Sequence, residues 1–472
     1  MKNTQKQNFK HLDLSLDELE LLAKQGCVDV QYNLALYYKE EKNWAKAAEW
    51  FAKAAELGDK QAQFYLGVCH ERGYGVEQNF VKAAEWFTKA AEQGVSEAQL
   101  NIAIFYKLGK GVDKDDAKFA AWLIKAAEQD NALAQYNLAV CYQDGIDVIQ
   151  NSEKTVKWYR KAAEQGLDKA QYNLGVCYED GAGVEKDTAE AVYWYNQAAE
   201  QGYAEAQNNL ANCYQNGIGV ATDLSKAIKW YTEAAKQGMA EAQCNLALYY
   251  LNGKGVRKNL KKAFKLFSEA AEQCDKQAQF HLGVCHQNGY GVEQDIVKAA
   301  KWYTKAAEQG LPEAQYNIAL LYRLGDGVDK NDAKYAAWLI KAAEQDNAMA
   351  QYNLAICYRD GIGVDPDISM AIKWYTEAAE QGLAEAQNSL AFYYLKGEYI
   401  KRDLKKAFKL LSESAEQGNE SAQYNLALCY EYGCGVEKNL IKAVEWCRKA
   451  AAQGNESARN ELALCLKELE GK

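Results

Sequence analysis

Residues 168–203 read DKAQYNLGVCYEDGAGVEKDTAEAVYWYNQAAEQGY, and this unit of 36 residues decides the fold. Its first part places small and apolar residues at helical spacing, from Ala170 to Cys177. The turn GAGV follows, and Asp187 then stands where a side-chain oxygen can accept the first free N–H groups of a second helix. Gly202 suits the left-handed residue that ends such a helix. The unit therefore predicts two helices joined by a glycine turn.

The same unit recurs along the whole chain. Its glutamine appears at a constant step of 36 residues, at Gln63, Gln99, Gln135, Gln171, Gln207, Gln243, Gln279, Gln315, Gln351, Gln387 and Gln423. Gln31 precedes the series by 32 residues, and Arg459 takes the next expected place after it. One helical pair of this size cannot bury its own apolar face, so neighbouring units must stack. The spacing predicts an all-α fold, a right-handed α/α superhelix (solenoid) of 36-residue helix-turn-helix repeats.

The two ends of the series set the expected domain boundaries. We expect residues 15–469 to form a single solenoid domain of about 12 repeats, with a half-repeat at each end. Ser15 and Glu18 have the spacing of a capping box, which would open a lone second-type helix. Residues 1–14 are polar and are expected to be a disordered tail.

Some turns depart from the repeat. Asp147 and Tyr399 replace the second glycine of the turn between the two helices. The glycine that ends the second helix is replaced at Asp130, Cys274 and Asp346. We expect these turns to be locally reshaped, because glycine is favoured where φ is positive.

Charge and composition exclude several classes of function. The chain has 472 residues with 55 Lys+Arg against 65 Asp+Glu, a net charge of −10. This balance argues against nucleic acid or an anionic membrane surface as the main partner, since both need clustered cations. The chain has no apolar run long enough to insert in a membrane and no signal-peptide pattern, so a cytoplasmic location is expected. The 4 histidines leave little material for catalysis, and we expect no cofactor, no metal and no catalytic residue.

The pattern A-x-A-Q-Y-N-L-A-x-C-Y…G-x-G-V…K-A-x-x-W-Y-x-K-A-A-E-Q-G resembles the Sel-one-like repeat, a relative of the tetratricopeptide repeat. The resemblance runs from about Ser15 to Leu466. It implies a non-catalytic scaffold or adaptor that binds a protein or peptide partner, through an extended segment or a helix of that partner. It also implies that the first helix of each repeat lines a concave groove. We expect the chain to be a monomer.

Carried over through the AQYNL string, the groove positions follow the repeat glutamine. We number positions from that glutamine. Position +2 carries an asparagine in most repeats, namely Asn33, Asn101, Asn137, Asn173, Asn209, Asn245, Asn317, Asn353 and Asn425. Asparagine is a mediocre residue inside a helix, so its recurrence needs a reason. Position +1 carries aromatic residues that include Tyr136, Tyr172, Tyr316 and Tyr352. A row of amides can clamp an extended peptide backbone without reading its sequence.

Two roles for these rows remain open. In the first, the asparagines and tyrosines contact a partner directly. In the second, asparagine bridges neighbouring helices and tyrosine packs between repeats. Charged residues at position +8 would set specificity if the groove binds a partner; these are Lys107, Arg323, Arg359, Glu71, Glu179 and Glu431.

The cysteines bear on an enzymatic alternative. Eight of the 13 fall at position +6, which also accepts Tyr, Phe or Leu, so we expect buried free thiols: Cys69, Cys141, Cys177, Cys213, Cys285, Cys357, Cys429 and Cys465. Cysteine-rich relatives of the resembling family carry two cysteines per repeat and include proteins described as hydrolysing β-lactams. Most repeats here have one, which disfavours a β-lactam or cell-wall hydrolase. His281 and Cys285 share a helix face, but no further ligands complete a zinc site. A third hypothesis is an adaptor exported by a route without a recognisable signal.

Overall fold

The computed structural model describes residues 15–470, and all secondary structure in this range is α-helical. The predicted disordered tail, residues 1–14, lies outside the described residues. By their internal contacts the residues divide into two compact units, one up to Gln237 and one from Gly238 onward. Each unit is described by itself below. The expectation that residues 15–469 form a single domain stays a prediction.

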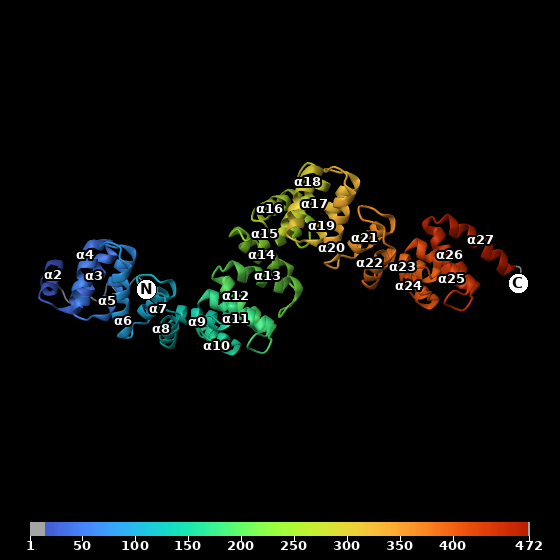
Figure 1. Cartoon of the computed structure of the whole chain (residues 1–472). Helices are drawn as coiled ribbons and strands as arrows, with labels where there is room; N and C mark the ends of the chain where they lie inside the picture. Colours follow the sequence, from blue (N-terminus) through green and yellow to red (C-terminus); the bar gives the residue numbers. More distant parts are fainter. Residues whose placement is uncertain (1–14, 471–472) are drawn as a thin grey trace. The chain divides into compact units, whose positions relative to one another are not determined.

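Residues 15–237, the described part of the first unit, contain thirteen helices. Figure 1 labels them in chain order. They are α2 (Leu16–Lys24), α3 (Val28–Glu40), α4 (Trp44–Glu56), α5 (Lys60–Arg72), α6 (Phe80–Glu92), α7 (Ser96–Leu108), α8 (Asp116–Glu128), α9 (Ala132–Asp144), α10 (Ser152–Glu164), α11 (Asp168–Asp180), α12 (Thr188–Glu200), α13 (Ala204–Asn216) and α14 (Leu224–Lys236).

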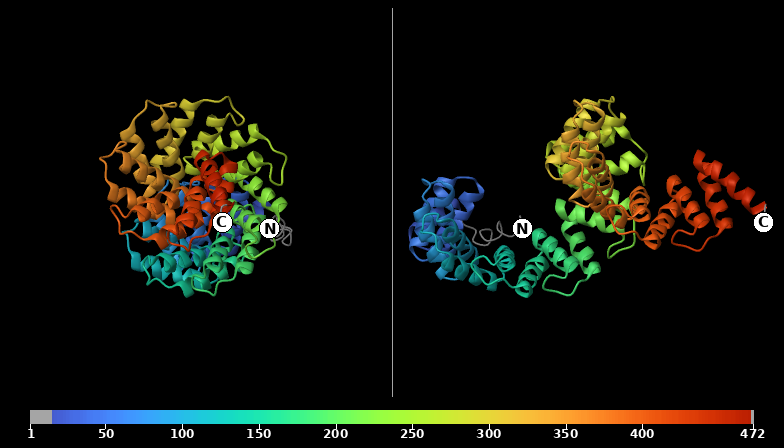
Figure 2. Two further views of the ribbon diagram at one scale, coloured as in Figure 1. Left: turned by 90° about the vertical axis from the view of Figure 1, so that its right-hand side faces the viewer. Right: turned by 45° about the vertical axis from the view of Figure 1, so that its right-hand side comes forward.

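The second unit continues the same alternation. Its helices are α15 (Ala240–Asn252), α16 (Leu260–Glu272), α17 (Lys276–Asn288), α18 (Ile296–Glu308), α19 (Pro312–Leu324), α20 (Asp332–Ala343), α21 (Ala348–Asp360), α22 (Ile368–Glu380), α23 (Ala384–Lys396), α24 (Leu404–Glu416), α25 (Glu420–Tyr432), α26 (Leu440–Gln453) and α27 (Glu456–Glu470). Within each unit every helix packs beside the one before it (Figure 2). The predicted all-α solenoid of 36-residue helix-turn-helix repeats is confirmed.

The predicted helix start signals form the expected hydrogen bonds. Asn79 accepts a hydrogen bond from the Lys82 backbone N–H at 2.9 Å, and the other Asp and Asn caps of the second helices do the same. At the amino-terminal end, Ser15 and Glu18 form the capping box around α2. These side chains satisfy N–H groups that have no partner inside the helix.

The recurring glutamine has a structural role. Gln171 donates through Nε2 to the carbonyl of Ala163, eight residues earlier, at 3.2 Å. Its Oε1 accepts a hydrogen bond from Nε2 of Gln201, 30 residues later, at 2.7 Å. Equivalent glutamine pairs recur in other repeats of both units, for example between Gln453 and Gln423. This buried ladder links the end of one second helix to the next repeat, and it explains why each repeat from Gln31 to Gln423 keeps glutamine at this position.

The departing turns keep the positive φ of the repeat glycines. Asp147 and Tyr399 have φ values of 60° and 66°, close to the 74° of Gly183. The sign of φ is therefore unchanged at these two residues, and the local reshaping of the turns stays a prediction. Where glycine is lost at the end of the second helix the left-handed region is also kept, but φ is smaller, 57° at Asp130 against 88° at Gly166.

Candidate functional site

The predicted groove residues occupy matching places in the first helices. Asn101 lies on α7, Asn209 on α13 and Asn245 on α15. The others lie on α9, α11, α19, α21 and α25: Asn137, Asn173, Asn317, Asn353, Asn425, Tyr136, Tyr172, Tyr316 and Tyr352. All twelve side chains are half-buried. Each one therefore combines contacts inside the protein with some exposed surface.

The tyrosines at position +1 pack within their own repeat. The ring of Tyr136 lies 5.7 Å from that of Tyr159 on α10, and the ring of Tyr352 lies 5.8 Å from that of Tyr375 on α22. These tilted pairs have the centroid spacing that aromatic rings favour. The packing role left open above is thus present for these residues.

The asparagines at position +2 bond across neighbouring repeats. Asn353 donates through Nδ2 to the hydroxyl of Tyr316 at 3.4 Å and to the carbonyl of Met349 at 2.8 Å. Asn425 donates to Oδ1 of Asn388 at 2.9 Å. The structure therefore brings the predicted residues Asn353 and Tyr316 together. An asparagine amide has two N–H donors and a separate carbonyl acceptor, so Asn353 keeps its Oδ1 as an acceptor.

A pocket of about 250 Å³ lies beside one of the predicted asparagines. Asn173, Val176 and Asp180 of α11 line it together with Gln143 at the end of α9. Burial raises the pKa of the Cys177 thiol, which also lines the pocket, to about 11. That thiol is protonated near neutral pH, and no histidine is among the lining residues, so the pocket lacks an activated nucleophile.

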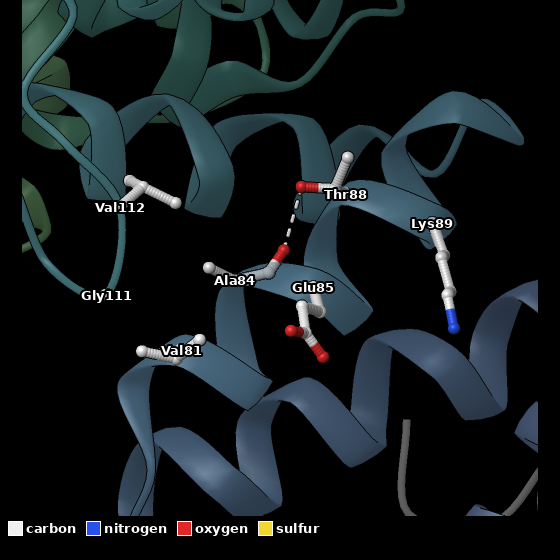
Figure 3. A pocket seen from close by; sticks show the side chains of 7 residues that line it. All are labelled: Val81, Ala84, Glu85, Thr88, Lys89, Gly111 and Val112. Atoms are coloured by element: carbon white, nitrogen blue, oxygen red, sulfur yellow. Dashed lines mark hydrogen bonds between the residues drawn. The ribbon is translucent and has the colours of Figure 1, made fainter.

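A second pocket, of about 310 Å³, lies on a second helix (Figure 3). Val81 and Ala84 of α6 and Val112 of the turn after α7 make it largely apolar. Thr88 donates its hydroxyl to the carbonyl of Ala84 at 2.8 Å, so that hydroxyl is already bonded inside the helix. The sequence did not point to this pocket, because each of its lining residues is ordinary for its repeat position.

Most of the charged residues at position +8 are paired within the protein. Glu71 meets Lys110 at 3.1 Å, and Arg323 meets Asp332 at 2.7 Å. The other pairs are Lys107 with Asp147, Glu179 with the Tyr195 hydroxyl, and Arg359 with Asp360. Internal pairing explains why these positions vary in sign, and it competes with the predicted role in partner specificity.

Glu431 behaves differently from the other +8 residues. Its side chain is buried, and its Oε2 has no hydrogen-bond partner among the described residues. Carboxylate oxygens of Glu431 and Glu461 and the Sγ of Cys465 lie within 4.8 Å of one another. Sequence reasoning missed this group as a unit. The available signal was Glu461, which stands at position +2 counted from Arg459, where most repeats have asparagine.

The prediction of buried free cysteines is confirmed. The two histidines of α17, His281 and His286, pack against aromatic rings. All eight cysteines at position +6 are buried and free. His281 stacks on Phe267 with ring centroids 5.1 Å apart, and His286 meets Phe264 edge-on at 5.4 Å. Burial lowers the pKa of both histidines, so both are neutral packing residues near pH 7.

Comparison with known proteins identifies the repeat. A model of the Sel1 repeat matches twelve consecutive segments between residues 28 and 455. The crystal structure of c5321, a protective antigen of uropathogenic Escherichia coli with an SLR fold, is 36% identical with a TM-score of 0.76, and the match covers 89% of this chain and 90% of that one. A Sel1 repeat protein from Oxalobacter formigenes is 34% identical with a TM-score of 0.46, over 51% of this chain and 96% of that one. None of the curated proteins compared with the chain matches it significantly. No described helix is both long and apolar enough to cross a bilayer.

Proposed function

The chain belongs to the Sel1 repeat family, and we propose that it is a non-catalytic scaffold that binds an extended segment of a partner protein along its first helices. The fold is typical of protein–protein interaction scaffolds. The observation that carries the proposal is the row of half-buried asparagines and tyrosines that recurs at two fixed positions of the first helices.

The chemistry of the row suits a peptide backbone. An amide whose N–H groups bond inside the protein, as in Asn353, is held in place and presents its Oδ1. Such acceptors, in the repeats that carry asparagine at position +2, can take N–H groups of an extended chain with little loss of side-chain entropy. The pocket beside Asn173 and Val176 has room for a side chain of that segment.

Paired affinity capture tests the proposal. One bait is the native chain, and the second carries Asn137→Ala, Asn173→Ala and Asn209→Ala on α9, α11 and α13. A matched control carries three alanines at the exposed ends of second helices, in place of Glu92, Glu128 and Glu164. Circular dichroism checks that all three baits are folded.

We expect a partner that the native and control baits retain and the asparagine variant loses. Purified partner should then bind the asparagine variant at least about tenfold more weakly, since three hydrogen bonds are lost at about 0.5–1.5 kcal/mol each. Equal retention by all three baits would contradict binding at this face. The hydrolase alternative predicts turnover of a chromogenic β-lactam, and we expect none above buffer.

Location and oligomeric state form a separate part of the proposal. We propose a cytoplasmic monomer. The second candidate is an exported adaptor, which is favoured by the relative from uropathogenic Escherichia coli described as a protective antigen. Fractionation of source cells separates the two, because an exported adaptor would be recovered outside the cytoplasmic fraction. Light scattering of the purified chain should give a mass near 52.8 kDa for a monomer.

A further inference from the structure

The last helices of the second unit, α25 to α27, lack a hydrogen-bonding network that several other repeats contain. In those repeats a tyrosine of the second helix donates its hydroxyl to the residue at position +8, as Tyr159 does to Gln143 at 2.7 Å. The asparagine at position +2 of the following repeat bonds to the same hydroxyl, as Asn173 does to Tyr159. The network thus joins two first helices through one second helix.

At the end of the chain each member of this network differs. Cys447 of α26 stands where the tyrosine would be, and Glu461 of α27 stands where the asparagine would be. The +8 residue is Glu431, near the end of α25. The second-helix hydroxyl that serves Gln143 in an earlier repeat therefore has no counterpart on α26 for Glu431.

Glu431 lacks the tyrosine donor of the second helix, and no lysine or arginine pairs with it among the described residues. Its side chain is 7% exposed, and its Oε2 is shielded from solvent with no partner in the described part of the chain. Glu71 also lacks the tyrosine, since Phe87 takes that place, and there Lys110 compensates at 3.1 Å. Glu431 instead faces a second carboxylate.

The three groups around Glu431 converge. One carboxylate oxygen of Glu431, one of Glu461 and the Sγ of Cys465 lie within 4.8 Å of one another. Glu461 and Cys465 are four residues apart on α27, so they lie on the same face of one helix. Two carboxylates this close repel each other when both are ionised, and either a proton taken up by one of them or a bound cation relieves the repulsion.

We propose that Glu431, Glu461 and Cys465 bind one divalent transition-metal ion of the Zn²⁺ class, which ties the terminal helix α27 to α25. Two oxygens and one sulfur form a donor set that Zn²⁺ accepts, and three protein ligands leave a fourth position for water. The thiolate disfavours Mg²⁺ and Ca²⁺, which take oxygen ligands. Metal binding releases the thiol proton and any proton that the two carboxyls share.

Cobalt(II) titration of the reduced, untagged full-length chain tests the site. Co²⁺ substitutes for Zn²⁺ and gives a thiolate-to-metal charge-transfer band when sulfur is a ligand. The test variants are Cys465→Ser, Glu461→Gln and Glu431→Gln. The matched control is Cys285→Ser, because Cys285 is buried at the same +6 position of α17 in the same unit.

A fourth variant keeps the test valid if the others fold poorly. Glu461→Asn restores the residue that most repeats carry at this position, so it should fold at least as well as the native chain. It removes a proposed ligand at the same time. Circular dichroism of each variant confirms the helical fold before titration.

The expected result is one Co²⁺ per chain with a charge-transfer band, displaced by Zn²⁺ and not by Mg²⁺. Cys465→Ser should abolish the band. Each of the other test variants, Glu461→Asn included, should weaken metal binding at least about 100-fold. Loss of a residue that only supports a ligand already costs about 10–100-fold in affinity, so loss of a ligand itself should cost at least as much. Cys285→Ser should bind as the native chain does. Absence of stoichiometric binding would overturn the proposal and favour a proton shared by the two carboxyls. Binding that Cys465→Ser or Glu461→Asn leaves unchanged would also overturn it.

Discussion

The second glycine of the turn between the two helices should be sensitive to the smallest side chain. Gly183 has a φ of 74°, and a Cβ built on it would lie 2.2 Å from the carbonyl oxygen of Ser152. Ser152 is the first residue of α10, in the preceding repeat. The glycine therefore allows two repeats to approach at their backbones. Gly166 offers a matched control, because its φ is 88° and a Cβ there would meet nothing within 4 Å.

The two alanine substitutions separate strain from collision. A left-handed backbone costs an L-residue about 1–2 kcal/mol, and both variants incur this cost. Only Gly183→Ala must also move the backbone of α10, and overpacking of that kind adds about 1–3 kcal/mol. We expect Gly166→Ala to lower the free energy of unfolding by about 1–2 kcal/mol and Gly183→Ala by about 2–5 kcal/mol.

Hydrogen exchange read by mass spectrometry measures this locally, which suits a solenoid whose repeats contact their neighbours only. Amides of α10 and α11 should lose protection in Gly183→Ala, and helices several repeats away should not. Urea unfolding supplies the global comparison. Equal destabilisation by the two variants, within about 0.5 kcal/mol, would refute the argument that close backbone approach fixes glycine at this turn.

Three further outcomes follow from the same contacts. Tyr399→Gly should raise the free energy of unfolding by about 0.5–1 kcal/mol, and the urea midpoint with it, because it relieves a φ of 66° at some cost in backbone entropy; an unchanged or lower midpoint would contradict this. Gln171→Ala should lower the free energy of unfolding by about 1–3 kcal/mol, since the carbonyl of Ala163 and Nε2 of Gln201 both lose a partner; Gln201→Ala, which removes one bond, is the milder control. Burial raises the pKa of the Cys285 thiol to about 12 from an ordinary 9, so the folded state keeps this proton longer than the unfolded state. The contribution of this thiol to stability is then fully present below about pH 9 and is lost as pH rises toward 12. A urea midpoint of the reduced protein that does not fall above pH 9 would rule this out.

The fold was predictable because one short pattern carries all its signals. The 36-residue step, the Asp and Asn caps and the turn glycines each point to the same helix pair, and the structure confirms them. The role of the repeat glutamine was not predictable in the same way. Gln171 bonds to Ala163 and Gln201, and these partners are 8 and 30 residues away, which no local rule connects.

The candidate site was predictable in position more than in chemistry. Sequence spacing placed Asn353 and Tyr316 on neighbouring first helices, and the structure joins them by a hydrogen bond. Spacing alone does not reveal how much of each amide is used inside the protein. The packing of Tyr352 on Tyr375 gives this residue a structural role, and the proposed binding role would use the part of its half-buried side chain that stays exposed.

Residues that depart from the repeat pattern become informative once the contacts between neighbouring repeats are known. Asp147 loses the turn glycine, and Lys107, the charged +8 residue of the preceding repeat, pairs with it. The charges of Asp147 and Lys107 thus neutralise each other in one ion pair. Either residue considered alone would look like an unfavourable departure from the repeat. Glu431 and Glu461 are also departures in neighbouring repeats, at positions +8 and +2, but both are acidic and they meet at a buried carboxylate oxygen. A repeat can change the residue at one position as long as the residue that contacts it changes in a complementary way. Two acidic residues in contact therefore require a third participant, a proton or a metal ion. The carboxy-terminal helices are accordingly the place where the repeat pattern alone does not explain which residues are present.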